Sequence, residues 1–190
     1  MRIPSAVGRS RQKCALLAVG VAAVLAATAG ASGAAPSLEP AIEATYLYKF
    51  APFVEWPPSA FSAPDSPLTI CVPADDPLAG LLAHAADGQK DGDRPIAVRA
   101  LGAADSAAGC HVLYLGSGNQ AAAQLAQTVQ DHPVLTVANS AGDPSIHAMI
   151  VFVVDNNRVR FDIDDAAAAR AGVAISSNLL ALARNVKPAP

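Results

Sequence analysis

Apolar side chains recur with helical spacing through residues 41–58, the most aromatic stretch of the chain. The apolar positions that follow this spacing are Ile42, Tyr46, Leu47, Phe50, Phe53 and Val54. Such a period is typical of an amphipathic helix. Pro52 lacks a backbone donor and clashes with the preceding turn, so we expect the helix to bend or end near Phe50. The proline-rich segment 55–66 then predicts a loop.

Short apolar runs alternate with helical patterns between residues 68 and 138. The predicted strands cover residues 68–72, 94–100, 110–115 and 134–137. One helix is predicted up to residue 86, capped by Asp75 or Asp76, and a second at 120–130. The leucines expected on the buried face of the first helix are Leu78, Leu81 and Leu82. Strands that alternate with helices favour a mainly parallel sheet with helices on both faces.

The pattern changes after residue 148, where two strand-like runs, 148–154 and 158–163, flank Asp155-Asn156-Asn157. Asparagine tolerates positive φ, so this segment predicts a β-hairpin that adds antiparallel edge strands. Asp164 or Asp165 should cap a helical turn that Gly172 ends, and Ser176 should cap a last helix, 177–186. The residues expected on its buried side are Leu179, Leu180, Leu182 and Ala183. The predicted fold class is α/β, a single compact domain with a mainly parallel central sheet flanked by helices and a C-terminal β-hairpin.

The N-terminal residues 1–35 contain four basic residues and no acidic residue. An apolar run follows the basic part, and small-residue A-x-A tripeptides follow the run, which together indicate a cleaved secretory signal peptide. A membrane anchor is the alternative, although small residues dominate and no basic stop-transfer flank follows. We therefore expect residues 36–190 to form the folded domain.

Removing residues 1–35 leaves nine Lys and Arg against sixteen Asp and Glu, a net charge near −7. No basic stripe remains, which argues against nucleic acid as a partner. No second long apolar run occurs, and the expected location is the periplasm.

Two cysteines remain beyond the signal segment, Cys71 and Cys110. In an oxidising compartment an even pair indicates a disulfide, and two separate buried thiols are the alternative. A metal site is not expected, because neither these cysteines nor the four histidines show ligand spacing. The histidines are His84, His111, His132 and His147.

Two motifs could carry other chemistry. Gly116 and Gly118 stand between a predicted strand and helix with the spacing of a dinucleotide fingerprint, but a sharp turn also requires glycine. Asp162, Asp164 and Asp165 could indicate calcium, although a strand face followed by a helix cap is simpler. No nucleophile and base stand at a catalytic spacing, so neither an enzyme nor a cofactor is expected.

Aromatic residues around the proline-rich loop are the candidate interaction surface. Phe53, Glu55, Trp56 and Phe61 are the candidate partner-binding residues, because aromatic side chains on a rigid loop are common anchors of protein interfaces. The alternative is that these aromatic residues cover one end of the sheet and belong to the core.

Six pieces of the sequence, the first of them in two parts, resemble one family and occur in its order. Residues 44–50 (ATYLYKF) and 53–57 (FVEWP) resemble the opening signature of the YfiR-like periplasmic proteins. The later segments that resemble the family are LTICV at 68–72, CHVLYL at 110–115, VLTV at 134–137, RFDI at 160–163 and the serine- and leucine-rich run at 175–183. The resemblance spans essentially all of residues 36–190.

The resemblance implies a small periplasmic repressor with a compact, often dimeric α/β fold. It would bind the periplasmic sensor domain of an inner-membrane diguanylate cyclase, lowering cyclic di-GMP and biofilm formation. An OmpA-like outer-membrane lipoprotein would sequester it. The resemblance also supports a disulfide between Cys71 and Cys110.

Two features depart from the family pattern. The chain has no further cysteine beyond the signal segment for a second disulfide, and Pro52 and Asp164 stand where other residues are expected.

The alternative function is a periplasmic module that binds a small ligand at the open end of the sheet. A dinucleotide enzyme would rest on Gly116 and Gly118 alone.

Overall fold

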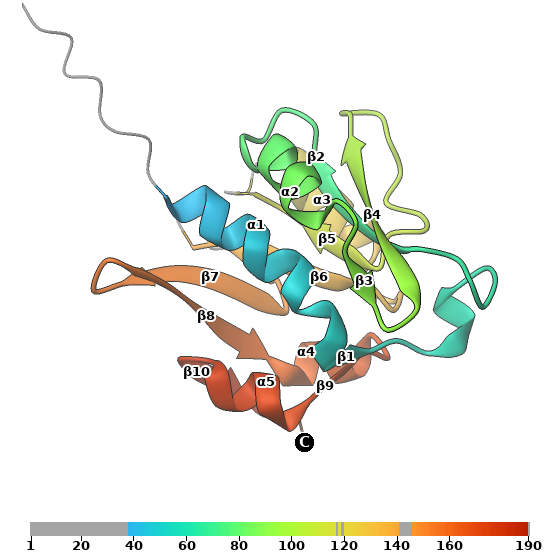
Figure 1. Ribbon diagram of the computed structural model, residues 1–190. Coiled ribbons are helices and arrows are strands. Elements are labelled where there is room, and N and C mark those ends of the chain that lie inside the picture. The colour runs from blue at the N-terminus through green and yellow to red at the C-terminus, as the bar shows by residue number, and fades with distance from the viewer. Residues whose placement is uncertain (1–37, 117, 119, 141–145, 190) are drawn as a thin grey trace, which may run out of the picture. The chain divides into compact units, whose positions relative to one another are not determined.

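Helices flank a mainly parallel sheet in the computed structural model, in agreement with the predicted α/β class (Figure 1). The structure describes residues 38–116, 118, 120–140 and 146–189, which belong to one compact unit, Ser37–Pro190. The predicted signal peptide, residues 1–35, lies outside the described residues.

The described helices include five α-helices and two short 3₁₀ helices: α1 (Glu39–Lys49), η1 (Ala51–Phe53), η2 (Pro58–Ala60), α2 (Leu78–Ala86), α3 (Gln120–Thr128), α4 (Asp165–Arg170) and α5 (Ser177–Leu182). The described strands are β1 (Val54–Glu55), β2 (Leu68–Pro73), β3 (Lys90–Asp91), β4 (Arg94–Leu101), β5 (Val112–Tyr114), β6 (Leu135–Asn139), β7 (Ile150–Asp155), β8 (Arg158–Asp164), β9 (Ala174–Ile175) and β10 (Asn185–Lys187).

Among the described residues, eight strands form the central sheet in the order β10-β8-β7-β6-β5-β2-β4-β3. The pairs from β4 through β2, β5 and β6 to β7 are all parallel. The strand that follows β2 in the parallel sheet, β4, lies on one side of it, and the strand that follows β5, β6, lies on the opposite side. In such sheets, ligands bind beyond the carboxyl ends of the strands where these directions diverge.

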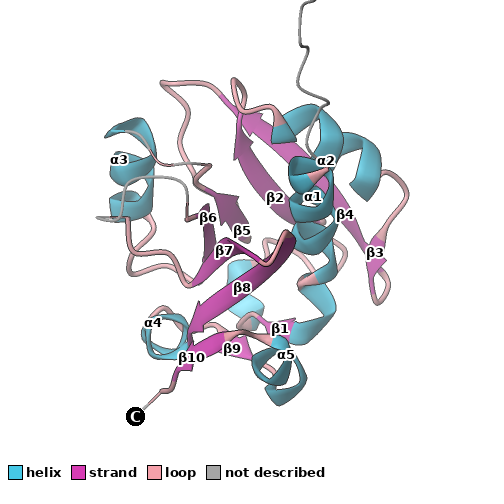
Figure 2. Cartoon of the chain, turned by 90° about the vertical axis from the view of Figure 1, so that its left-hand side faces the viewer, coloured by secondary structure: helices cyan, strands magenta, loops and turns pink. Residues whose placement is uncertain are grey.

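Both faces of the sheet are buried, because alternate residues of each strand point to opposite sides. Ile70 and Val72 of β2 pack in the cluster that contains α1 and α2, whereas Cys71 between them packs in the cluster that contains α3. Figure 2 shows α1 and α2 on one side of these strands and α3 on the other.

The aromatic first helix forms part of the core, as its spacing predicts. Leu47 and Phe50 are buried, and Tyr46 contacts Phe50 with ring centroids 5.9 Å apart. Phe50 also lies 5.8 Å from Phe152 of β7 and 5.2 Å from Phe161 of β8. The α-helix ends at Lys49, and Pro52 falls in the 3₁₀ turn η1, so the predicted end near Phe50 is confirmed.

The disulfide joins Cys71 of β2 to Cys110, two residues before β5, with the two Cα atoms 5.8 Å apart. It cross-links two neighbouring parallel strands on the α3 side of the sheet. The pairing expected from the cysteine count is therefore present in the fold.

The β7–β8 hairpin is confirmed, and its turn residues Asn156 and Asn157 have φ angles of 48° and 60°. Its predicted position at the sheet edge is wrong. β7 pairs in parallel with β6, and β8 pairs in parallel with β10, which is the strand at the edge.

The predicted last helix is too long, because α5 ends at Leu182 and the chain continues into β10. Arg184 forms a salt bridge with Asp162 of β8 at 2.5 Å, and Lys187 pairs with Asp164 at 2.9 Å. These pairs, together with the backbone contacts of β10, hold the chain extended along β8. A helix pattern read from the sequence cannot anticipate such distant partners.

Three residues expected on buried helix faces are exposed instead: Ile42 at 40%, Leu81 at 42% and Leu182 at 59%. On α2, the buried face consists of Leu78, Leu82 and Ala86, four residues apart, which turns Leu81 outward. On α1, the buried residues are Glu43, Ala44 and Leu47. Glu43, the residue after Ile42, therefore faces inward, and Ile42 faces outward. On α5, Leu179 makes the buried contact of a six-residue helix.

Candidate functional site

The loop that follows β1 is held on the protein by its aromatic residues. Trp56, the single tryptophan of the chain, donates its indole N–H to the carbonyl oxygen of His111 at 3.1 Å. The Phe61 ring stacks on the His111 imidazole with centroids 4.3 Å apart and planes 20° from parallel. Trp56 and Phe61 thus meet on one histidine that lies immediately before β5.

His111 is nearly buried and is fixed by two hydrogen bonds. Its Nδ1 accepts the backbone N–H of Thr69 at 3.1 Å, so we assign the ring proton to Nε2, which donates to the carbonyl oxygen of Ala60 at 3.1 Å. Burial lowers the pKa of His111 below its ordinary value of 6.5, and nearby Arg94 adds to that effect. The histidine is therefore a neutral structural support for the loop.

Arg94, the first residue of β4, covers the other side of the loop. Its guanidinium carbon lies 3.7 Å from the Phe61 ring centroid, a cation–π arrangement. The same guanidinium donates to the carbonyl oxygen of Ser66. The resulting order Arg94–Phe61–His111 is a three-layer stack that joins the loop to two strands of the sheet.

Phe53 and Glu55 lie at the start of the same loop. Phe53 is half-buried against the core, and its carbonyl oxygen accepts the N–H of Ser176 at 2.9 Å. Glu55 is exposed in β1, which pairs in antiparallel fashion with β9. We use the name aromatic loop for residues 53–66, together with the stacked side chain of Arg94.

The structure brings the predicted residues together in part. Trp56 and Phe61 meet through His111. Phe53, the last residue of η1, is hydrogen-bonded to Ser176, and Glu55 lies in β1, which pairs with β9. Phe53, Trp56 and Phe61 are half-buried, and Phe53 and Trp56 pack against the core. The interface role of these residues stays a prediction. The sequence indicated neither Arg94 nor His111 as supports, although His111 stands out as a histidine at the start of an apolar strand.

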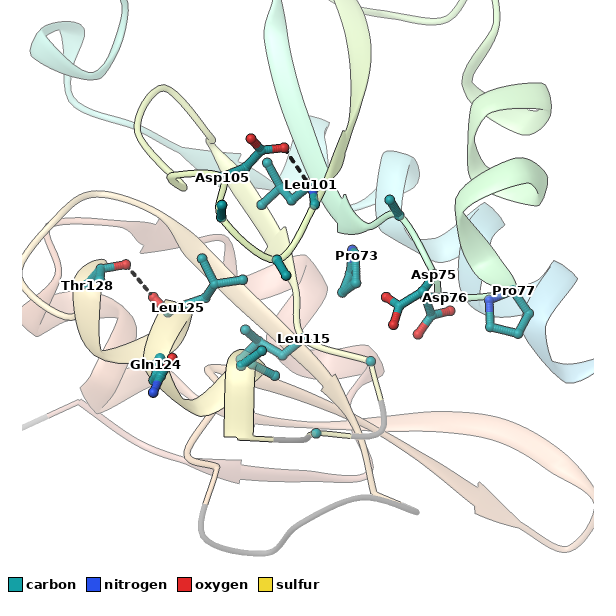
Figure 3. A pocket seen from close by; sticks show the side chains of 18 residues that line it. Pro73, Asp75, Asp76, Pro77, Leu101, Asp105, Leu115, Gln124, Leu125 and Thr128 are labelled. Atoms are coloured by element: carbon teal, nitrogen blue, oxygen red, sulfur yellow. Dashed lines mark hydrogen bonds between the residues drawn. The ribbon is translucent and has the colours of Figure 1, made fainter.

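A cleft of about 620 Å³ lies at the carboxyl ends of β2, β4 and β5. Figure 3 shows Asp75 and Asp76 pointing into it from the β2–α2 side, with Gln124 and Leu125 of α3 across from them. Leu101 and Leu115 contribute apolar surface. The lining residues that the structure describes include three aspartates and no lysine or arginine, so the cleft disfavours phosphate groups.

Gly116 at this cleft has a structural reason to be glycine. Its φ is 62°, and a Cβ at this position would lie 2.6 Å from Oδ2 of Asp76. Asp76 in turn accepts the N–H of Leu78 at 2.8 Å, so its carboxylate occupies the anion position at the start of α2. This geometry favours the sharp-turn interpretation of the glycine pair over a dinucleotide site.

Glu43 of α1 is a buried carboxyl group close to the cleft, with 3% of its surface exposed. It accepts the hydroxyl of Tyr114 on β5 at 3.1 Å and the amide of Asn139 on β6 at 2.6 Å. Burial raises the pKa of Glu43 to about 7, and the carboxylates of Glu39 and Asp76 act in the same direction. The sequence analysis did not identify Glu43 as a functional residue, although Glu43 is an acidic residue between the apolar Ile42 and Ala44 of the first helix.

The described part of the chain contains no group of three or more His, Cys, Asp or Glu residues that could hold a metal ion. Within the same part, no helix has both the length and the apolar character needed to cross a membrane.

The sheet with helices on both faces defines the class of small α/β domains. Residues 40–184 match the sequence profile of the YfiR/HmsC-like family. Because the match covers most of the chain, the protein belongs to the YfiR/HmsC-like family. A comparison with curated proteins gives no match.

Proposed function

We propose that this protein is a periplasmic negative regulator of an inner-membrane diguanylate cyclase. It would bind the periplasmic sensor domain of the cyclase and lower cyclic di-GMP and biofilm formation. The observation that carries the proposal is the YfiR/HmsC-like match across residues 40–184. Binding the inactive state of the sensor more tightly than the active state is sufficient to shift the cyclase toward inactivity, so the regulator needs no catalytic group.

The aromatic loop supports this proposal as the contact surface. Phe53, Trp56 and Phe61 are half-buried rather than fully buried, and hydrogen bonds and ring stacking hold the loop in place. Rigid aromatic side chains lose little conformational entropy on binding, which makes them effective interface anchors. Exposed Glu55 beside them would add charge complementarity.

Titration of the purified protein with the cyclase sensor domain tests the surface. Trp56→Ala and Phe61→Ala should each weaken binding at least tenfold, as expected for interface anchors. Val154→Ala, which truncates a 51% exposed apolar residue at the β-hairpin, is the matched control and should bind like the wild type.

The melting temperature of each variant separates a role of the Trp56 ring in partner binding from a role in stability. Trp56→Phe keeps an aromatic ring but loses the N–H donor to His111, whose carbonyl oxygen still accepts the N–H of Leu135 at 2.8 Å. We expect this variant to lose about 1 kcal/mol of stability and to keep most of its affinity. Unchanged affinity in the folded Trp56→Ala and Phe61→Ala variants would exclude the aromatic loop as the contact.

Two further partners belong to the proposal. An OmpA-like outer-membrane lipoprotein would sequester the regulator and release the cyclase, and the regulator would form a homodimer. Co-purification from cells and sedimentation of the purified protein test these partners separately.

One observation favours a second candidate function, the binding of a small ligand. The cleft of about 620 Å³ lies where the strand order diverges, the usual position of ligands in open α/β sheets, and its size is typical of small-molecule sites. Thermal-shift screening against nucleotides and amino acids tests it. A specific hit without any effect on cyclase binding would support this function, and the absence of hits would exclude it for these ligand classes.

A further inference from the structure

Glu43 connects the first helix to the middle of the sheet. Its two oxygens take separate partners, Tyr114 on β5 and Asn139 at the end of β6, so one side chain joins three elements. We use the name Glu43 cluster for these three residues. A carboxyl group that is 97% removed from solvent in this way is unusual, because burial of a charged group costs several kcal/mol unless a cation offsets it.

No cation in the described part of the chain offsets Glu43. Among the residues that the structure describes, the salt bridges join Asp162 to Arg184 and Asp164 to Lys187, on the far edge of the sheet. The titratable groups that act on Glu43 are Glu39 on its own helix, Asp76 at the start of α2 and Tyr114 on β5. The two carboxylates repel a negative charge on Glu43, and the tyrosine, whose pKa is itself raised mainly by burial, stays protonated and neutral.

Two opposing effects act on the proton of Glu43. The hydrogen bonds that Tyr114 and Asn139 donate favour the ionised carboxylate. Burial and the repulsion from Glu39 and Asp76 favour the protonated acid, and burial is the largest contribution. Protonation therefore removes a buried charge, and ionisation places that charge between α1 and the sheet.

We propose that Glu43 is a proton-controlled attachment of α1 to the sheet, which holds the helix firmly when it is protonated and weakens that hold when it is ionised. The helix runs directly into η1, β1 and the aromatic loop, so a looser α1 would loosen the start of that loop. If the proposed function holds, partner binding would depend on pH in the same way, but the attachment itself does not depend on any partner.

Hydrogen exchange of the purified protein tests the attachment directly. After correction for intrinsic exchange, amides of α1 should lose protection by roughly 30-fold between pH 5.5 and pH 8, because opening lets Glu43 ionise in water. Amides of α3, on the other face of the sheet, that exchange through local opening of α3 are the internal control and should not follow this change. In Glu43→Gln, which cannot ionise, α1 should lose this pH dependence.

The proposal is overturned if wild-type α1 shows equal protection at both pH values, or if Glu43→Gln retains the wild-type change. A carbon-detected titration of the Glu43 carboxyl in the wild-type protein does not depend on the folding of any variant. A midpoint near 7 supports the proposal, whereas a midpoint near the ordinary value of 4.5 overturns it.

Discussion

Replacement of Glu43 by glutamine should change how the stability of the protein depends on pH. The unfolded chain loses the Glu43 proton near the ordinary pKa of 4.5, whereas the folded protein keeps it until about pH 7. Between these values the folded state binds more protons than the unfolded state, so the free energy of unfolding falls as pH rises. The stability from this group is fully present below about pH 4.5 and is lost as pH rises through about 7.

The size of this effect follows from the two pKa values. A rise from 4.5 to about 7 corresponds to about 3 kcal/mol of stability, a large share of the total for a domain of this size. It corresponds to a change of about 10 °C in melting temperature. Glutamine has nearly the same shape and can still accept one hydrogen bond in the cluster, but it carries no charge at any pH.

Urea unfolding of both proteins at several values between pH 4 and pH 8 measures the effect. The difference in unfolding free energy, Glu43→Gln minus wild type, should rise by about 3 kcal/mol across this range. Other titrating groups are common to both proteins and cancel. Glu55→Gln, a change at an exposed glutamate, is the matched control, and its difference from wild type should stay constant. A constant difference for Glu43→Gln as well would refute the reasoning.

Three other substitutions test the fold. Cys71→Ser should cost about 4 kcal/mol, because the disulfide spans 39 residues, and equal melting of the wild type with and without reductant would contradict this. Gly116→Ala should lower the unfolding free energy more than Gly88→Ala, since both glycines have positive φ but only Gly116 approaches Asp76. Equal losses of unfolding free energy in the two variants would exclude the steric contribution. Asp162→Ala removes the partner of Arg184, so amides of β10 should lose hydrogen-exchange protection. The loss of global stability should stay below about 1 kcal/mol, because both side chains are partly exposed. Retained protection of the β10 amides would contradict this prediction.

The sequence predicts the elements well where local chemistry decides them. The helical spacing around Phe50 and the break at Pro52 place the first helix, and Asn156-Asn157 place the hairpin turn. Ser176 accepts the N–H of Leu179, as a capping serine should. Each of these features depends on residues close together in the chain, so its cause is visible in the sequence.

The features that the sequence missed depend on distant partners. β10 is extended because it pairs with β8, more than 20 residues earlier in the chain, and local propensity does not include this. Glu43 faces inward because Tyr114 and Asn139 lie 71 and 96 residues away and donate hydrogen bonds to it. For the aromatic loop, the sequence indicated the rings, but the support from Arg94 and His111 required the fold.

The level of cyclic di-GMP in cells tests the proposed function most directly. Cells that lack this protein and express the membrane cyclase should contain more cyclic di-GMP than wild-type cells. The wild-type gene should restore the lower level, and Trp56→Ala should not. An unchanged cyclic di-GMP level after the deletion, with the cyclase present in the membrane, would contradict the proposal that this YfiR/HmsC-like protein restrains the enzyme.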